Sequence, residues 1–192
     1  MNVKPLSEQF PAGCYIGFNA ALDRKASEQL VSVCGDAVKN GYKQITLCLT
    51  SIGGLLDFAY YAFNILEALP VKIVTHNIGS VQSAANLIFL CGDERYAAPG
   101  CSFLFHNTGF EAAAGQQITG PFITEKLKAI DYEENRAAGI YAEKTGLSIE
   151  DVSKWQQGTL VMIGDAAIKN GLIKAVKPLT IPEGAFFHQI VV

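Results

Sequence analysis

Apolar and polar positions follow two patterns along this chain, one typical of strands and one typical of helices. Short apolar runs rich in β-branched residues predict strands over residues 14–18, 44–50, 71–77, 95–98, 102–106 and 172–176. Apolar residues spaced three or four apart predict helices over residues 26–40, 55–66, 121–146 and 165–170, with a further helix start at 148–151. Residues 108–120 are rich in Gly and Ala, and we expect them to be irregular.

The repeated strand–helix units predict an α/β fold with a mostly parallel sheet and right-handed crossovers. No internal repeat or linker stands out, so we expect one domain over residues 1–192. Residues 1–13 would form a short N-terminal extension and residues 177–192 a C-terminal tail. The end of that tail, residues 186–192, is apolar and β-prone, so it needs a surface to cover on this subunit or on a neighbour.

Composition narrows the class of protein. The net charge is −3 without a basic cluster, which disfavours binding to nucleic acid or to an anionic membrane. The N-terminus lacks the apolar segment of a signal peptide, and no uncharged apolar stretch reaches the length of a membrane span. The five Cys residues have no metal-binding or redox spacing. They are expected to be reduced core residues of a cytoplasmic protein.

The candidate chemistry begins at Ser83. An apolar strand-like run ends at Gly79, where we expect a tight turn, and Ser83 then opens a stretch with helical spacing. Such a junction can expose a hydroxyl and direct free backbone N–H groups at the same point, which suits a nucleophile with an oxyanion hole. The alternative is that Ser83 is only an N-cap, since Ser is among the preferred residues there.

A second glycine corner and a histidine complete the candidate site. Gly53-Gly54 follows a buried strand, and a glycine backbone can approach a ligand closely. Both corners fall at the C-terminal ends of predicted parallel strands, where ligands collect in open α/β sheets. His106 ends another strand and is a candidate base. His76 has a similar position, and His188 in the tail is a weaker candidate.

Four short motifs together resemble the proteolytic subunit of the Clp-type serine proteases. Thr50-Ser51-Ile52-Gly53-Gly54 is similar to the family's Asn-Ser-Pro-Gly-Gly turn, and Gly79-Ser80-Val81-Gln82-Ser83-Ala84 to its Gly-x-Ala-x-Ser-Met corner. Phe103-Leu104-Phe105-His106-Asn107 resembles its Met-Ile-His-Gln segment, and Lys169-Asn170-Gly171-Leu172-Ile173 its Glu-Tyr-Gly-Leu-Ile ending. The motifs keep the family's order and nearly its intervals across residues 14–176.

The resemblance implies a fold and a set of roles. The fold would be the one shared by Clp proteases and crotonases, with a protruding helical handle. Ser83 would be the nucleophile, His106 the general base, and the N–H groups of Gly54 and Ala84 the oxyanion hole. A peptide or an unfolded protein would lie as an added strand beside Gly53, with Ser51 also in the substrate-binding turn. No cofactor or metal is implied.

The third triad position departs from the family pattern. The family's Asp falls on Thr159 here, whose hydroxyl can fix the tautomer of the imidazole but cannot stabilise the imidazolium by charge. Asp165 is a possible substitute acid, although we favour a role as the N-cap of its helix. Lys126 or Lys128 could instead form a Ser–Lys dyad, but their helix is charged and we favour solvated lysines.

Other departures concern assembly. Residues 1–13 are too short to match the family's N-terminal axial segment, so this would be a divergent member, and docking to a Clp ATPase is in doubt. The resemblance implies a ring-type homo-oligomer, a heptamer or tetradecamer. The interval from His106 to Gly146 is longer than in the family, in the region through which the family's rings stack, and this leaves the form of the oligomer open. We therefore expect a self-compartmentalised serine endopeptidase. The alternatives are a crotonase-fold acyl-CoA enzyme and a catalytically impaired structural homologue.

Overall fold

In the computed structural model, which describes residues 4–110 and 112–191, strands and helices alternate as the apolar rhythm predicts. Met1–Val3 of the expected N-terminal extension, Glu111 and Val192 lie outside the described residues. The chain forms two compact units. The first unit runs to Leu104 and resumes at Val161, and the second unit spans Phe105–Leu160. The expectation of a single domain stays a prediction.

The first unit is built on a parallel sheet. Its strands lie in the order β6-β5-β3-β2-β1-β8, with β4 paired to β3 and β7 paired to β4. Six strand pairs in this sheet are parallel: β1–β2, β1–β8, β2–β3, β3–β4, β3–β5 and β4–β7. The strands are β1 (Cys14–Asn19), β2 (Gln44–Ser51), β3 (Lys72–Gln82), β4 (Glu94–Ala97), β5 (Ser102–Phe105), β6 (Leu160–Ile163), β7 (Ala175–Val176) and β8 (Phe186–Ile190).

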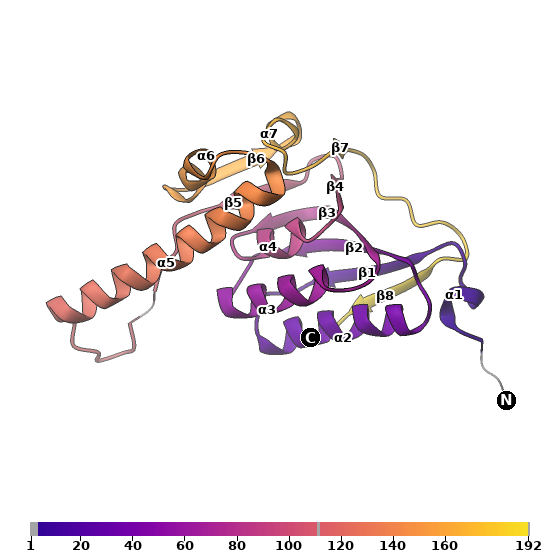
Figure 1. Ribbon diagram of the computed structural model, residues 1–192, viewed down its shortest axis with the longest axis horizontal. Helices are drawn as coiled ribbons and strands as arrows, with labels where there is room; N and C mark the ends of the chain where they lie inside the picture. Colours follow the sequence, from indigo (N-terminus) through magenta and orange to yellow (C-terminus); the bar gives the residue numbers. More distant parts are fainter. Residues whose placement is uncertain (1–3, 111, 192) are drawn as a thin grey trace. The chain divides into compact units, whose positions relative to one another are not determined.

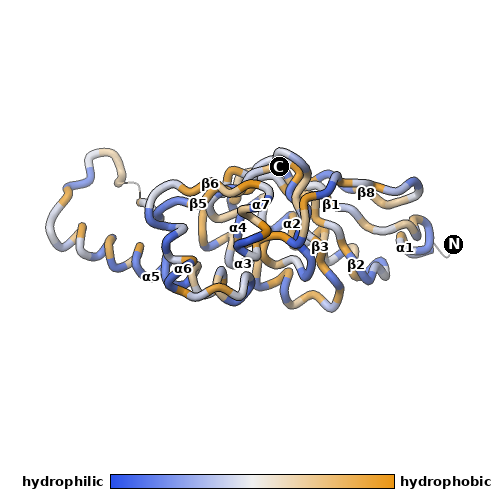
Figure 2. The backbone as a smooth tube through the Cα atoms, turned by 90° about the horizontal axis from the view of Figure 1, so that it is seen from above, coloured by the Kyte–Doolittle hydropathy of each residue, from blue (hydrophilic) through white to orange (hydrophobic). Residues whose placement is uncertain are grey.

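Helices cover one face of this sheet (Figure 1). They are α2 (Arg24–Lys39), α3 (Leu56–Glu67) and α4 (Ala85–Leu90), while α1 (Leu6–Gln9) and α7 (Gly164–Lys169) are short and lie elsewhere in the unit. Alternate strand residues such as Ile16, Phe18 and Leu47 are fully buried. Figure 2 shows apolar stretches in the strands and in α4, whose six residues are all buried. This core holds the C-terminal ends of β2 and β3, where the candidate site lies.

The second unit contains the long helix α5 (Gly120–Thr145), then α6 (Ile149–Ser153) and the 3-10 turn η1 (Lys154–Gln156). The hydroxyl of Thr119 caps α5 and Pro121 lies in its first turn, while Gly146 ends it in the left-handed conformation. Ser148 caps α6, as predicted. The rings of Phe105, Tyr141 and Trp155 pack together with centroids 4.9 to 6.0 Å apart.

Several sequence predictions were wrong in detail. Gly79 is not a tight turn, because β3 continues through it to Gln82. Helix α4 begins at Ala85 with Ala84 as N-cap, so Ser83 is not the cap. Asp165 is not an N-cap either, since Ile163 occupies that position of α7 and no side chain caps the helix. Strand β6 and helix α1 were not predicted.

The tail finds its surface within this chain. Residues Phe186–Ile190 form β8, which pairs with β1 in the register Cys14 to Phe186 through Phe18 to Ile190. The rings of Phe10 and Tyr42 lie 5.8 and 6.2 Å from the ring of Phe186. The sequence showed that the tail needed an apolar partner, and the structure identifies that partner as the edge of β1.

Candidate active site

Ser83 occupies a strained corner between β3 and α4. Its φ of 53° makes it the one non-glycine residue with a positive φ among the described residues. This region of backbone space is costly for a residue with a side chain, by about 1–3 kcal/mol, and persists where the surroundings enforce it. The Ser83 N–H donates to the carbonyl of Leu104 at 2.8 Å. A serine on a sharp strand-to-helix turn is typical of activated nucleophiles.

A buried asparagine holds this corner in place. The amide nitrogen of Asn86 donates to the carbonyl of Ser83 at 3.0 Å and to that of Leu104 at 2.9 Å. Asn86 is 1% exposed, so these bonds form away from water. The sequence analysis missed this residue. Its signal was a lone amide side chain within the apolar run that follows Ser83.

The Gly53-Gly54 turn packs directly against the Ser83 corner. A Cβ atom added at Gly53 would lie 2.6 Å from the carbonyl oxygen of Gln82, 2.8 Å from the Cβ of Ser83 and 3.1 Å from the amide nitrogen of Ala84. Gly53 also has a φ of 86°. Only glycine fits here, because both the space and the backbone conformation exclude a side chain. The structure therefore brings together the two glycine-bearing corners that the sequence singled out.

Two backbone amides at this junction donate no hydrogen bond within the described residues of the first unit. Gly53 accepts a hydrogen bond from the N–H of Leu22 at 2.8 Å, and the N–H of Leu55 donates to Leu22 at 2.9 Å. Because backbone groups alternate along an extended segment, Gly54 directs its own N–H away from Leu22. Within the first unit, neither the Gly54 N–H nor the Ala84 N–H donates a hydrogen bond. Such donors are the elements of an oxyanion hole.

Ser51 shapes the turn from inside. Its hydroxyl donates to the carbonyl of Ala20 at 2.6 Å and accepts from the N–H of Gly53 at 3.1 Å. The side chain is 4% exposed, so its hydroxyl is used within the protein. The predicted contact of Ser51 with substrate stays a prediction, and the structure gives this side chain a positioning contact as well.

The second unit carries His106. Its Nδ1 lies 2.6 Å from the carbonyl oxygen of Asn107. A carbonyl can only accept, so Nδ1 carries the proton and Nε2 keeps the lone pair that a general base needs. The Asn107 side chain in turn accepts from the N–H of Gly158 at 2.7 Å, and Thr108 N–H donates to Glu134 of α5 at 2.9 Å. Asn107 is the second residue whose contribution the sequence analysis missed.

Within the described part of the second unit, no candidate for the third catalytic residue makes a hydrogen bond to His106. Thr159 directly follows Gly158, which is bonded to Asn107, but Thr159 is exposed and its hydroxyl makes no hydrogen bond within the second unit. The ammonium of Lys126 lies 5.4 Å from the centroid of the Phe122 ring, and Lys128 is exposed. Asp165 is exposed in the first turn of α7 in the first unit. The roles of Thr159, Asp165 and the lysines remain predictions.

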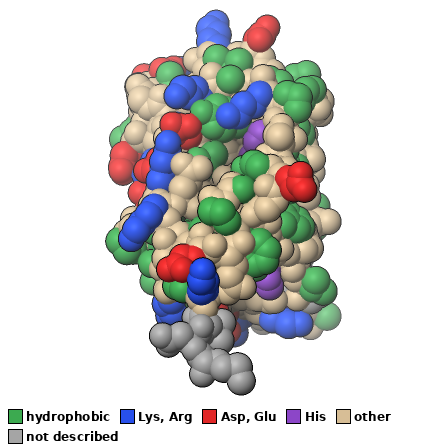
Figure 3. Space-filling view, turned by 90° about the vertical axis from the view of Figure 1, so that its right-hand side faces the viewer, with side chains coloured by type: hydrophobic (Ala, Val, Ile, Leu, Met, Phe, Trp, Pro, Cys, Tyr) green, Lys and Arg blue, Asp and Glu red, His purple; other side chains and the backbone are tan. Residues whose placement is uncertain are grey.

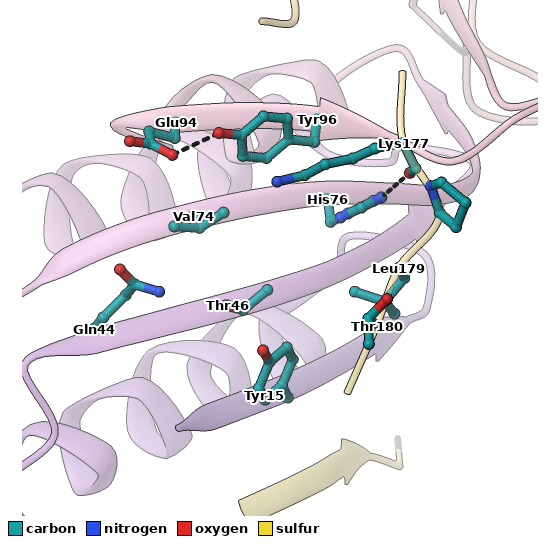
Figure 4. A pocket seen from close by; sticks show the side chains of 11 residues that line it. Tyr15, Gln44, Thr46, Val74, His76, Glu94, Tyr96, Lys177, Leu179 and Thr180 are labelled. Atoms are coloured by element: carbon teal, nitrogen blue, oxygen red, sulfur yellow. Dashed lines mark hydrogen bonds between the residues drawn. The ribbon is translucent and has the colours of Figure 1, made fainter. Parts of the chain in front are cut away.

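His76 belongs to a different hollow. It lines a pocket of about 270 Å³ on the sheet face (Figure 4). Its Nε2 donates to the carbonyl of Lys177 at 3.0 Å, and burial lowers the pKa of His76 below its usual value. The Lys177 ammonium lies 3.3 Å from the Tyr96 ring centroid, and the Tyr96 hydroxyl donates to Glu94 at 2.6 Å. His76 thus lines this polar pocket, and its hydrogen bond goes to Lys177 rather than to the Ser83 corner.

With the geometry described, comparison with known proteins identifies the family. A family model for Clp protease matches residues 15–178. The chain belongs to the Clp protease family. An ATP-dependent Clp protease proteolytic subunit 2 from Borreliella burgdorferi is 30% identical over 135 residues, covering 68% of this chain and 65% of the relative. The matched part of this chain thus spans slightly under two thirds of that relative's length.

Two further Clp proteins are similar to this chain. An ATP-dependent Clp protease proteolytic subunit 2 from Pseudomonas aeruginosa is 24% identical over 167 residues, with 84% of this chain and 81% of the relative covered. A solved structure of a ClpP1 mutant from Listeria monocytogenes superimposes with a TM-score of 0.77 at 18% identity, covering 93% of this chain and 98% of that chain. This likeness confirms the predicted Clp-type fold.

Two properties of the described residues bear on other functions. None of their helices is both long enough and apolar enough to cross a bilayer. No group of three His, Cys, Asp or Glu side chains among them could hold a metal ion. On the face that Figure 3 draws, Lys and Arg side chains lie among Asp and Glu side chains, so this face carries no field of a single sign.

Proposed function

We propose that this chain is a Clp-type serine endopeptidase. Ser83 is the nucleophile, His106 the general base, and the N–H groups of Gly54 and Ala84 form the oxyanion hole. The observation that carries this proposal is the strained Ser83 corner packed against Gly53, with two amides that donate to no other group in the described part of the first unit. Backbone strain lowers the stability of a fold, so it usually persists where function requires it. Unused N–H donors at the same point can stabilise the negative charge of a reaction intermediate.

The reaction follows from these groups. The Ser83 oxygen attacks the peptide carbonyl while its proton moves to Nε2 of His106. The carbonyl oxygen gains negative charge, which the two amides stabilise by hydrogen bonds. The tetrahedral intermediate collapses, the C–N bond breaks, and His106 returns the proton to the leaving amine. A water molecule, deprotonated by His106, then hydrolyses the acyl ester and releases Ser83.

The peptide binds as an added strand. The outward C=O of Gly54 offers a main-chain hydrogen bond next to the oxyanion hole, and main-chain bonds ignore most side chains of the substrate. Such broad selectivity suits a protease that restricts access by assembling into a closed ring of identical subunits. A heptamer or tetradecamer and a cytoplasmic location remain our expectations, and docking to a Clp ATPase stays in doubt.

Hydrolysis of a set of fluorogenic peptides tests the proposal. Ser83→Ala abolishes hydrolysis above the background of an empty preparation, and His106→Gln lowers kcat by about 10³-fold or more, as in other serine triads. Thr159→Ala and Asp165→Asn, measured in parallel, show which side chain supports His106. Unchanged hydrolysis in Ser83→Ala would remove the proposal. The absence of hydrolysis in the wild-type chain would favour the impaired homologue.

A further inference from the structure

Strand β8 forms an open edge of the sheet in the first unit. It is the last strand in the order β6-β5-β3-β2-β1-β8 and pairs with β1 alone among the described residues. Figure 1 shows it beside β1 at the end of the sheet. The match to the family model ends at residue 178, so β8 lies beyond the residues that this model matches.

The backbone of β8 offers hydrogen-bonding groups on its outer side. The N–H of Phe186 donates to the carbonyl of Gly13 at 2.8 Å, toward β1. Because backbone groups alternate along a strand, Phe186 and His188 serve the β1 ladder. Phe187 and Gln189 then direct their N–H and C=O groups to the open edge. An unpaired row of this kind is a template for another strand.

The sequence of β8 lacks the charged residues and the proline that usually protect an edge strand against such pairing. Soluble proteins guard an edge strand with Lys or other charges, with Pro, or with a bulge. The segment Phe186-Phe187-His188-Gln189-Ile190-Val191 contains no Lys, Arg, Asp, Glu, Pro or Gly. Phe187 is 47% exposed and Val191 is 76% exposed. A short apolar segment without charge favours association of identical strands.

We propose that β8 is an interaction surface for a second copy of this chain, whose own β8 pairs with it edge to edge. A two-fold axis relates the copies, so the strands run antiparallel and each supplies the same groups. The strand carries no carboxylate or ammonium, so its self-pairing brings no such like charges together. One short strand buries little area, so this contact gains strength when several copies engage at once.

The proposal does not depend on Ser83 chemistry. It concerns a different feature, the main-chain edge of a strand that lies beyond the residues matched by the family model. It also differs from a peptide docked on β8, because the occupant is the same segment of an identical chain. Loss of the peptidase proposal would therefore leave this one standing, and the reverse also holds.

Sedimentation over a dilution series tests the contact, with Phe187→Pro as the decisive variant. Proline at 187 removes an outward N–H and leaves the β1 ladder intact, since Phe187 does not donate to β1. Phe187→Val is the matched control, because it also removes the ring but keeps the N–H and suits a strand. We expect Phe187→Pro to weaken self-association at least tenfold relative to Phe187→Val. Equal association of the two variants would overturn the proposal.

Cys14 reports whether β8 stays docked in each variant. Its Cα pairs with that of Phe186 and its side chain is 1% exposed. A slow reaction of Cys14 with a thiol reagent shows an intact β1–β8 pair. If Phe187→Pro exposes Cys14, Phe187→Lys replaces it, since an edge lysine blocks pairing without removing an N–H. The same tenfold loss is expected there, and association equal to that of Phe187→Val would again overturn the proposal.

Discussion

At the scale of single residues, the site depends on backbone positions more than on side chains. Ser83 adopts a φ of 53°, and Gly53 and Gly54 have φ values of 86° and 155°. In the proposed site, these three conformations would direct one hydroxyl and two amides to the same junction. The surrounding bonds from Asn86 and Ser51 enforce them, which is how a fold keeps strain at a working site.

Gly53→Ala tests the close approach of the two corners. The new Cβ would lie 2.6 Å from the Gln82 carbonyl oxygen, so the turn must move away from Ser83. We expect a loss of hydrolysis of about 10²-fold or more, as when an oxyanion donor is removed, together with about 1–3 kcal/mol of stability. Gly35→Ala is the control, because a Cβ there meets nothing within 4 Å. Equal hydrolysis by both variants would contradict the packing described here.

His76 gives the fold a pH dependence of its own. Burial holds the pKa of His76 below the value of the unfolded chain, so the unfolded state binds a proton first as pH falls. Stability is therefore full above the unfolded pKa of about 6.5 and declines below it.

His76→Gln should flatten this decline, because Gln can still donate to the Lys177 carbonyl but does not titrate. One imidazole contributes a slope of at most about 1.4 kcal/mol per pH unit. Urea unfolding at pH 7.5, 6.5 and 5.5 measures it, with His188→Gln as the control. An identical slope in wild type and His76→Gln would show that His76 is not the group responsible.

At the scale of elements, the sequence predicted most of the order of helices and strands, but it predicted their end residues less well. The alternating apolar runs located β1, β2, α2, α3 and α5 closely, because each carries a clear period or a cap. Gly79 misled the analysis, since glycine usually marks a turn. Here it allows close approach, as a Cβ at Gly79 would lie 2.8 Å from Oγ1 of Thr50. Only tertiary contact explains that glycine.

The site was predictable where it followed motifs and not where it followed tertiary bonds. The spacing of Gly53, Gly54, Ser83 and Ala84 located the glycine corner and the serine corner, which the structure places in contact. Asn86 and Asn107 act through hydrogen bonds to segments distant in sequence, which no local pattern reveals. Asp165 is a favoured capping residue, but it lies two residues after Ile163, the N-cap position that forms.

The pairing of β2 with β3 predicts how two substitutions combine in their effect on stability. The register of these strands shifts between Leu49 and Ser51, where the Thr50 hydroxyl donates to the Ser80 carbonyl at 3.1 Å. Gly79→Ala would push Thr50 aside and should cost about 1–3 kcal/mol. Adding Thr50→Ala removes the obstructing oxygen, so the two changes together should cost less than their sum. Strict additivity in chemical denaturation would show that the two residues do not press on each other.

At the scale of the whole molecule, the five cysteines form a probe of the native state. Cys14, Cys34, Cys48, Cys91 and Cys101 are all buried and carry reduced thiols. Burial raises the pKa of Cys34 to about 12 and that of Cys14 and Cys48 to about 11. Since the thiolate is the reactive form, the native protein should react slowly with a thiol reagent at pH 8, and all five should react after unfolding. Rapid reaction of several thiols in the native protein would contradict the described core.

The proposed catalysis needs groups from both units. The first unit carries Ser83 and the two amides, and the second carries His106 with its proton fixed on Nδ1. The central claim is that these groups act together on one peptide bond. Mutual dependence of the serine and the histidine is therefore the property to measure.

A fluorophosphonate probe measures this dependence directly. The purified protein is labelled at neutral pH and the adduct is mapped by tandem mass spectrometry, with Ser83→Ala, His106→Gln and Lys126→Ala treated alike. The account predicts a single adduct on Ser83 that disappears in Ser83→Ala, falls by orders of magnitude in His106→Gln and persists in Lys126→Ala. Labelling of Ser83 at the wild-type rate in His106→Gln, or an adduct on another residue, would contradict it.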